Sequence, residues 1–153
     1  MIIFGYPGIG KTTIAKDDYR FIDLDSGDIL IHGKYFRKKN WEETYCNVAM
    51  MLSKQGYFVF VSTHPKVISY IMRNTKDVCA CYPDVSLRKE WVGALYERYL
   101  DRPCRQTHNA WHRANVNYEK DVRELELLDC VKIRIPNAGF NVKKTILAVA
   151  DRG

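Results

Sequence analysis

The chain has 153 residues, which is enough for one domain with a sizeable hydrophobic core and too few for two. Hydrophobic residues make up 46% and charged residues 27%, as in globular proteins, and no apolar run approaches the ~20 residues that a membrane-spanning helix needs. The net charge of +6 fits a nucleic-acid partner or a pocket for several phosphates. We therefore expect a single domain over residues 1–153 with no membrane partner.

Cysteine usage indicates the compartment. The five cysteines form an odd set without a Cys-x-x-Cys pair, as expected of reduced thiols. A signal peptide is not expected, because the motif described next begins at residue 5. We therefore expect a cytoplasmic protein whose cysteines are small, buried apolar residues.

A short apolar run at residues 1–4 leads directly into a glycine-rich segment, Gly-Tyr-Pro-Gly-Ile-Gly-Lys-Thr, at residues 5–12. This is the P-loop pattern, in which glycines allow successive backbone N–H groups to surround a phosphate. Lys11 is expected to reach the β- and γ-phosphates of ATP, and the Thr12 hydroxyl to bind Mg²⁺. The remaining residues of the predicted ATP site on this segment are Gly8, Ile9, Gly10 and Thr13.

A second strand, predicted at residues 20–24, ends in two acidic residues, Asp23 and Asp25. Ligands of open α/β sheets bind at the carboxyl ends of the strands, so both carboxylates should reach the mouth of the P-loop. Their spacing of two residues places them on the same side of the strand. The alternative interpretation is that they cap the turn at residues 26–28.

Residues 30–40 contain a basic cluster with two aromatic residues inside it. We interpret this segment as a flap that closes over a substrate, as a nucleic-acid contact, or as a solvated loop. The amphipathic helix that follows contains Trp41 and Tyr45 and is closed by Gly56. Its apolar stripe is mostly core, but Trp41 and Tyr45 lie at the end nearest the flap and could also face a second substrate.

A continuous apolar segment at residues 57–62 has the pattern of a central parallel strand and is followed by Thr63-His64-Pro65. No acidic residue follows this strand, so the carboxylate for a metal should come from Asp23 or Asp25. His64 is either a substrate contact or a residue at the entry of the next helix, before Pro65.

The rest of the chain continues the alternation of strands and helices. A short helix at residues 67–73 precedes a fourth strand at 78–82, and a fifth strand at 131–135 precedes a terminal helix at 142–150. Two crossovers place the first strand centrally, which predicts a five-stranded parallel sheet in the order 2-3-1-4-5 within a three-layer α/β domain.

Two further amphipathic helices are predicted between the fourth and fifth strands, within residues 84–129. They bring six arginines into one stretch of the chain: Arg88, Arg98, Arg102, Arg105, Arg113 and Arg123. Because guanidinium groups suit phosphate oxygens, we expect a lid over the phosphates, with Arg98 in a catalytic role and Arg102 on ATP.

Cys104, His108 and His112 lie at i, i+4 and i+8, along one face of the second of these helices. This spacing suggests a zinc site. No fourth ligand is evident and both histidines have polar neighbours, so zinc is not the favoured interpretation.

The P-loop after the first strand, the Phe-Ile-Asp-Leu-Asp ending of the second, the absence of an acid on the third, and the arginine-bearing helices together resemble the nucleoside and nucleotide kinase branch of P-loop proteins. The resemblance spans nearly the whole chain and looks closest to small kinase-like proteins encoded by bacteriophages and related bacteria. It implies an ATP-dependent kinase that uses Mg²⁺ and transfers the γ-phosphoryl group to a hydroxyl or phosphate of a nucleoside or nucleotide.

Shikimate-type kinases are similar in one further respect, because an Asp-x-Asp ends their second strand. Carried over, Asp23 serves the Mg²⁺ shell and Asp25 orients or deprotonates the acceptor. The chain lacks their glycine triplet after the third strand and has Ala94 where the lid of nucleotide kinases often has a further arginine. Two alternatives stay open: another small hydroxylated metabolite as acceptor, or a nucleic-acid-linked kinase or nucleotide-binding module.

Overall fold

The computed structural model describes residues 1–24 and 41–152. The described residues form a sheet of five strands, all parallel, in the order β2-β3-β1-β4-β5, which confirms the predicted topology. The strands are β1 (Ile2–Gly5), β2 (Phe21–Asp23), β3 (Phe58–Val61), β4 (Val78–Pro83) and β5 (Val131–Ile135). Each lies within two residues of its predicted bounds.

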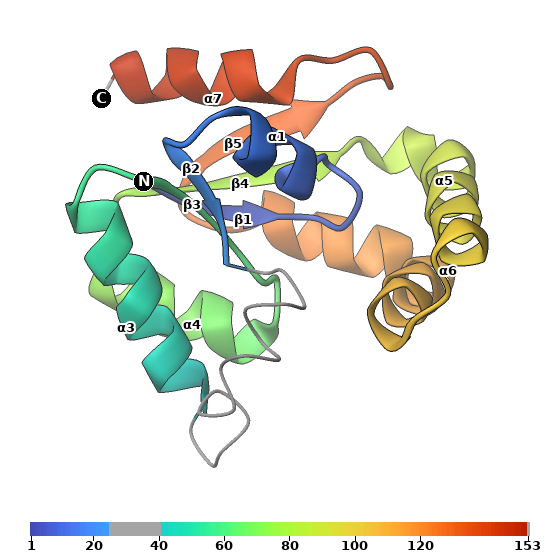
Figure 1. Ribbon diagram of the computed structural model, residues 1–153, viewed down its shortest axis with the longest axis horizontal. Helices are drawn as coiled ribbons and strands as arrows, with labels where there is room; N and C mark the ends of the chain where they lie inside the picture. Colours follow the sequence, from blue (N-terminus) through green and yellow to red (C-terminus); the bar gives the residue numbers. More distant parts are fainter. Residues whose placement is uncertain (25–40, 153) are drawn as a thin grey trace.

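Helices cover both faces of this sheet. The described helices are α1 (Lys11–Asp17), α3 (Trp41–Lys54), α4 (Pro65–Asn74), α5 (Arg88–Asp101), α6 (Arg105–Glu126) and α7 (Val142–Asp151), with a 3₁₀ turn η2 (Val85–Leu87) before α5. Figure 1 shows α1 and α7 on one face, and α3, α4 and the carboxyl-terminal part of α6 on the other. The helical pair α5–α6 projects from the side of the domain.

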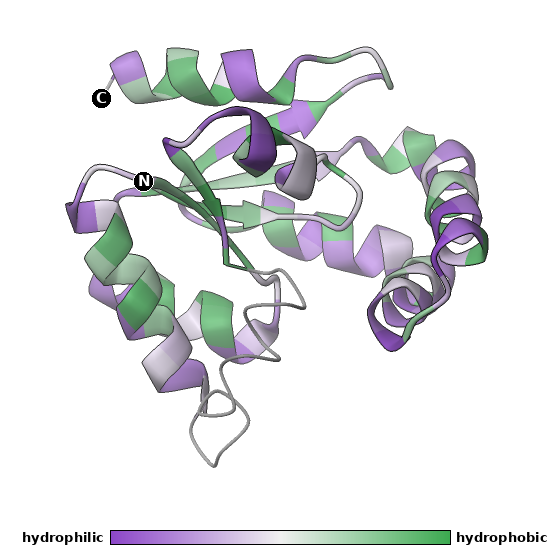
Figure 2. Cartoon of the chain, viewed as in Figure 1, coloured by the Kyte–Doolittle hydropathy of each residue, from purple (hydrophilic) through white to green (hydrophobic). Residues whose placement is uncertain are grey.

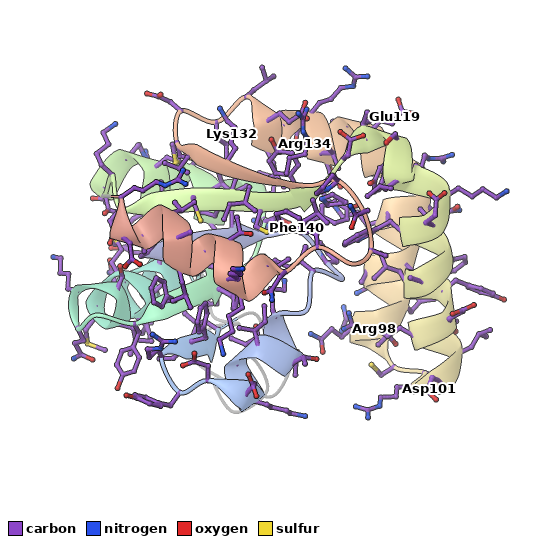
Figure 3. The ribbon with its side chains drawn as sticks, turned by 90° about the horizontal axis from the view of Figure 1, so that it is seen from above. Arg98, Asp101, Glu119, Lys132, Arg134 and Phe140 are labelled. Atoms are coloured by element: carbon purple, nitrogen blue, oxygen red, sulfur yellow. The ribbon has the colours of Figure 1, made fainter. Side chains whose placement is uncertain are left out.

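The core lies at the centre of the sheet. Ile2, Ile3 and Phe4 of β1 have no exposed surface, and burial of such a side chain contributes about 1.5–3 kcal/mol. β5 is different, because it forms an edge of the sheet and exposes Lys132 and Arg134, which are labelled in Figure 3. Figure 2 shows hydrophilic residues along this strand. Charged side chains on an edge strand oppose pairing with another chain.

Helix α6 begins at Arg105, because Cys104 caps it. The Cys104 thiol accepts a hydrogen bond from Thr107 N at 3.5 Å, and Thr107 Oγ1 accepts one from Cys104 N at 3.1 Å. This reciprocal pair is a capping box. The prediction that all cysteines are buried is therefore wrong for Cys104, which is exposed, and for Cys130, which is partly exposed.

Within the described ranges, no helix is both long and apolar enough to cross a membrane.

A buried carboxylate at the end of α1 pairs with Lys143 of α7 and with Arg20, just before β2. Asp18, at the end of α1, is 8% exposed and lies 2.7 Å from Arg20 Nη2 and 3.1 Å from Lys143 Nζ of α7. Hydrogen bonds from Arg20 hold the pKa of the Asp18 carboxyl well below its ordinary value. The ion pairs thus tie together two of the elements that cover the same face of the sheet.

Asp18→Asn should lower the melting temperature at neutral pH, because the neutral amide cannot pair with Arg20 and Lys143. A depressed folded-state pKa contributes stability that is present above the unfolded value of about 3.9 and is lost as the pH falls through the folded value. In thermal melts followed by circular dichroism, the difference between wild type and variant should therefore stay constant from neutral pH down to about pH 4 and narrow as the pH falls further. Asp17→Asn is the matched control, since exposed Asp17 contacts the same lysine. A difference that does not change with pH would contradict this account.

Candidate functional site

The loop between β1 and α1, residues 6–10, is called the glycine loop below. It lies at the carboxyl end of β1, in the middle of the sheet, and Tyr6 N donates to Cys81 O of β4 at 2.9 Å. Gly8 and Gly10 have φ values of 91° and 97°, which residues with a side chain rarely adopt. These two glycines are what lets the chain turn sharply from the strand into α1.

Lys11 and Thr12 begin α1 at the end of the glycine loop. Lys11 Nζ donates to Gly5 O at 3.0 Å, so the lysine lies back along its own loop. Thr12 Oγ1 donates to Asp23 Oδ2 at 2.9 Å, across to the end of β2. The structure therefore brings together the threonine and the first of the two aspartates that the sequence analysis selected as metal ligands.

Two oxygen ligands side by side make this the place where the described residues could hold a hard divalent cation. Mg²⁺ prefers carboxylate and hydroxyl oxygens, with water and substrate phosphates completing its shell. Asp25, predicted to act on the acceptor, lies outside the described residues, as does the basic segment within residues 30–40.

Helix α5 is seated directly on the glycine loop. Trp91 Nε1 donates a hydrogen bond to Pro7 O at 2.8 Å. A Cβ atom added at Gly8 would lie 2.9 Å from Trp91 Nε1 and 3.3 Å from Leu95 Cδ2. Gly8 is thus required twice, once for its backbone conformation and once because the indole leaves no room for a side chain.

A second contact joins the loop to α6. The ring of Tyr6 meets that of Tyr118 edge to face, with centroids 5.7 Å apart, and both residues are buried. Tyr118 OH in turn donates to Asp84 O at 2.7 Å. Burial raises the pKa of both hydroxyls well above their ordinary value, so both rings stay neutral.

Arg98 lies on the loop-facing side of α5, and Arg102 follows the end of the helix. Seven residues are close to two helical turns, so Arg98 follows Trp91 on the same face of the helix. Figure 3 shows Arg98 on the side of the helical pair nearer α1, with Asp101 farther out. Arg98 is exposed. Arg102 Nε lies 3.9 Å from the carboxylate of its neighbour Asp101, and both of these side chains are more than 80% exposed.

The other arginines of the predicted lid do not gather with these two. Arg113 forms a forked ion pair with Asp121, with contacts of 2.9 and 3.2 Å. Arg88 Nη2 donates to Asn115 O at 3.0 Å, which fixes it between α5 and α6. The single stretch of six arginines in the sequence is therefore divided among different surfaces of the helical pair.

Trp41, Tyr45 and His64, predicted to contact a substrate, form one aromatic cluster at the carboxyl end of β3. Trp41 meets Tyr45 and His64 edge to face, at centroid distances of 5.9 and 5.7 Å. Tyr45 has no exposed surface, and its hydroxyl accepts from Ser62 N at 3.0 Å. His64 Nδ1 accepts from Lys66 N at 3.2 Å and caps α4. These hydrogen bonds give Tyr45 and His64 structural roles. Trp41 is partly exposed.

The described part of the chain contains no group of three or more His, Cys, Asp or Glu side chains that could hold a metal ion. The rings of His108 and His112 stack at 5.9 Å, whereas Cys104 is occupied as the cap of α6. The i, i+4, i+8 spacing thus gives neighbouring side chains but not a zinc site.

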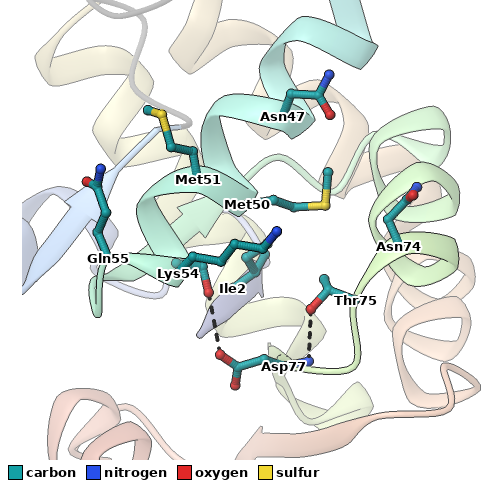
Figure 4. A pocket seen from close by; sticks show the side chains of 10 residues that line it. Ile2, Asn47, Met50, Met51, Lys54, Gln55, Asn74, Thr75 and Asp77 are labelled. Carbon is teal, nitrogen blue, oxygen red and sulfur yellow. Dashed lines mark hydrogen bonds between the residues drawn. The ribbon is translucent and has the colours of Figure 1, made fainter.

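A cavity of about 570 Å³ lies near the amino-terminal ends of the strands, away from the glycine loop, between the carboxyl ends of α3 and α4 (Figure 4). Its lining includes Ile2 at the start of β1 and Asp77 just before β4. Asp77 is held there by Ser53 Oγ at 3.4 Å and by Thr75 Oγ1, which accepts from Asp77 N at 3.2 Å. Open α/β sheets bind ligands at the carboxyl ends of their strands, which favours the glycine loop over this cavity.

The contacts of Trp91 and Tyr6 were not predicted. Trp91 falls within the two amphipathic helices predicted in residues 84–129, and nothing in the sequence indicated that its indole would meet Pro7, 84 positions earlier. The one available signal was the aromatic residue at position 6, inside a loop with two glycines.

Gly8→Ala should destabilise the protein more than Gly10→Ala. Both changes force alanine into a left-handed conformation at a cost of about 1–2 kcal/mol, but an added Cβ at Gly10 has nothing within 4 Å. The clash with Trp91 should add about 1 kcal/mol or more to the free-energy loss at Gly8. Urea denaturation of Gly8→Ala and Gly10→Ala, each alone and combined with Trp91→Phe, measures how much of the free-energy loss comes from the clash with the Trp91 indole. Equal losses at the two glycines would show that the indole does not restrict the loop.

No family model matches the sequence, and no curated protein matches it significantly. No relative therefore supplies an activity for comparison, and the contacts of the glycine loop are the basis of the functional proposal.

Proposed function

We propose that the chain is an ATP-dependent kinase that binds ATP with Mg²⁺ at the glycine loop and transfers the γ-phosphoryl group to a nucleoside or nucleotide. The observation that carries the proposal is the 2.9 Å contact between Thr12 Oγ1 and Asp23 Oδ2, next to Lys11 and to two glycines with positive φ. The loop supplies phosphate contacts and the oxygen pair supplies a cation site.

The two oxygens, which share a hydrogen bond, are close enough to bind one Mg²⁺ together. Neighbouring ligands of an octahedral Mg²⁺ at about 2.1 Å lie about 3 Å apart, close to the separation of Thr12 Oγ1 and Asp23 Oδ2. A bound Mg²⁺ would neutralise charge on the β- and γ-phosphates. Thr12 and Asp23 would hold it, and β2, which pairs with β3, fixes the aspartate.

Lys11 supplies the positive charge next to the phosphates. Its ammonium donates to Gly5 O, a neutral acceptor, and exchange of this contact for a phosphate oxygen would give a stronger, charge-assisted hydrogen bond. Arg98 is the second cation. Its place on the Trp91 face of α5 and its exposure would let it stabilise the charge that develops during transfer.

The acceptor side is supported by the ends of two neighbouring strands. Asp23 pairs in register with Phe60, so the residues that follow β2 and β3 lie next to each other. Partly exposed Trp41, which contacts His64 after β3, would offer a flat surface to a nucleobase. Asp25, two residues beyond Asp23, would position or deprotonate the acceptor hydroxyl.

Lys11→Ala should reduce phosphoryl transfer by about 10²–10³-fold or more, because the variant loses a cation at the transferred group. The increase in melting temperature that ATP and Mg²⁺ induce should be strongly reduced, while the melting temperature without nucleotide should change little. Transfer is measured against a panel of nucleosides, nucleotides, hydroxylated metabolites and oligonucleotides. Lys16→Ala, in the last turn of the same helix, is the matched control and should behave as wild type. An undiminished ATP effect in Lys11→Ala would refute the proposed site.

The variants Asp23→Asn and Asp25→Asn should distinguish a role in metal binding from a role at the acceptor. Asp23→Asn should weaken the Mg²⁺ dependence of ATP binding, since the amide carries no charge, whereas Asp25→Asn should leave ATP affinity nearly unchanged. The kcat of Asp25→Asn should fall by about 10²–10⁴-fold, the usual contribution of a general base. Calorimetric titration of ATP with and without Mg²⁺, together with steady-state kinetics, distinguishes the two. If both variants turn over like wild type with every acceptor, the carboxylates are turn caps.

A further inference from the structure

The α5–α6 pair carries a second concave surface, called the outer groove below, of about 630 Å³. The groove is lined by Arg88, Lys89, Val92, Gly93, Tyr96, Trp111 and Asn115. Lys89, Gly93 and Tyr96 project from the part of α5 opposite Trp91, because residues advance by about 100° along a helix. The outer groove is therefore separate from the glycine loop, which contacts the Trp91 face.

Aromatic rings form one wall of the outer groove. The rings of Tyr96 and Trp111 lie 5.1 Å apart, and Tyr99 stacks on Trp111 at 5.9 Å with an interplanar angle of 6°. His108 continues the row at 5.8 Å from Trp111. Tyr96 is 42% exposed, and Trp111 is partly exposed. Flat ring surface is thus held in place and open to solvent.

Positive charge lies at the end of the outer groove nearest the start of α5. Arg88 and Lys89 are both exposed, and Arg88 is oriented by its hydrogen bond to Asn115 O. A guanidinium has several N–H donors, and this bond engages only one of its nitrogens. Among the described residues that line the outer groove, none is acidic. The surface combines fixed aromatic rings with cations that no acidic lining residue offsets.

We propose that the outer groove binds a nucleotide unit, with the base against Tyr96 and Trp111 and the phosphate at Arg88 and Lys89. Bases stack on aromatic side chains whatever their sequence, and Arg and Lys bind phosphate oxygens. The volume lies within the range of small-molecule sites. A free nucleotide and a nucleotide within a single strand present the same chemistry, and the site is additional to the ATP site proposed above.

Gly93 offers a way to block the outer groove without disturbing the fold. It lies inside α5, has an ordinary helical conformation, and an added Cβ would have nothing within 4 Å. Leucine and alanine both favour a helix more than glycine does. Gly93→Leu should therefore fill the groove, and Gly93→Ala should leave most of it open.

The test measures binding of ATP, and separately of a fluorescein-labelled hexathymidylate, in a Lys11→Ala background that weakens the glycine loop. We expect at least one of these probes to bind Lys11→Ala and Lys11→Ala/Gly93→Ala alike. We expect Lys11→Ala/Gly93→Leu to bind that probe roughly tenfold more weakly or worse, the size of a lost stacking contact. Lys89→Gln, an exposed change, should also weaken binding and reduce its salt dependence.

Binding of ATP identifies a free nucleotide as the ligand, and binding of the oligonucleotide alone identifies a single strand. Either result supports the outer groove, provided that Gly93→Leu weakens binding of that probe roughly tenfold or more. The proposal is overturned if neither probe binds in the Lys11→Ala background, or if Gly93→Leu leaves the affinity for the bound probe unchanged. Melting temperatures of the Gly93 variants at or above that of Lys11→Ala confirm that the comparison is made between folded proteins.

Discussion

The burial of β1 between β3 and β4 is the constraint on which the candidate site depends. A strand without exposed surface must be apolar. Because β1 is the middle strand, its carboxyl end lies in the middle of the row formed by the carboxyl ends of the five strands. The glycine loop begins there and is held by Tyr6 N on Cys81 O. The neighbouring β3, and β2 beyond it, then place His64 and Asp23 at the same edge. The glycine loop, Asp23 and His64 thus lie at one edge of the sheet because of strand order.

The helical pair gives the loop its second support. Trp91 fixes the backbone at Pro7 and leaves no room for a side chain at Gly8, while Tyr118 packs against Tyr6. The part of the helical pair that contains Trp91 and Tyr118 is therefore part of the candidate site. The same helix α5 presents different chemistry on its two sides: Trp91 and Arg98 toward the loop, and Tyr96 with Lys89 in the outer groove.

Sequence patterns predicted the strands, their order and the short-range features of the site, because burial and glycine conformation are local properties. Thr12 and Asp23 could be paired in advance, since both follow from the carboxyl-edge rule. The contacts of Trp91 and the division of the arginines could not, because they depend on how α5 and α6 pack. Arg88 and Arg113 are close in sequence to Arg98, but their partners, Asn115 and Asp121, direct them elsewhere. Cys104 was a poor metal candidate for a similar reason, since its thiol caps a helix.

The most direct test is a crystal structure with a non-hydrolysable ATP analogue and Mn²⁺ in place of Mg²⁺, with the metal located by its anomalous scattering. The account predicts an anomalous peak at ligand distance from Thr12 Oγ1, beside the Asp23 carboxylate. It also predicts the β- and γ-phosphates inside the glycine loop, with Lys11 turned from Gly5 O toward them. A nucleotide bound away from the glycine loop, or a metal with no contact to Thr12 or Asp23, would contradict it.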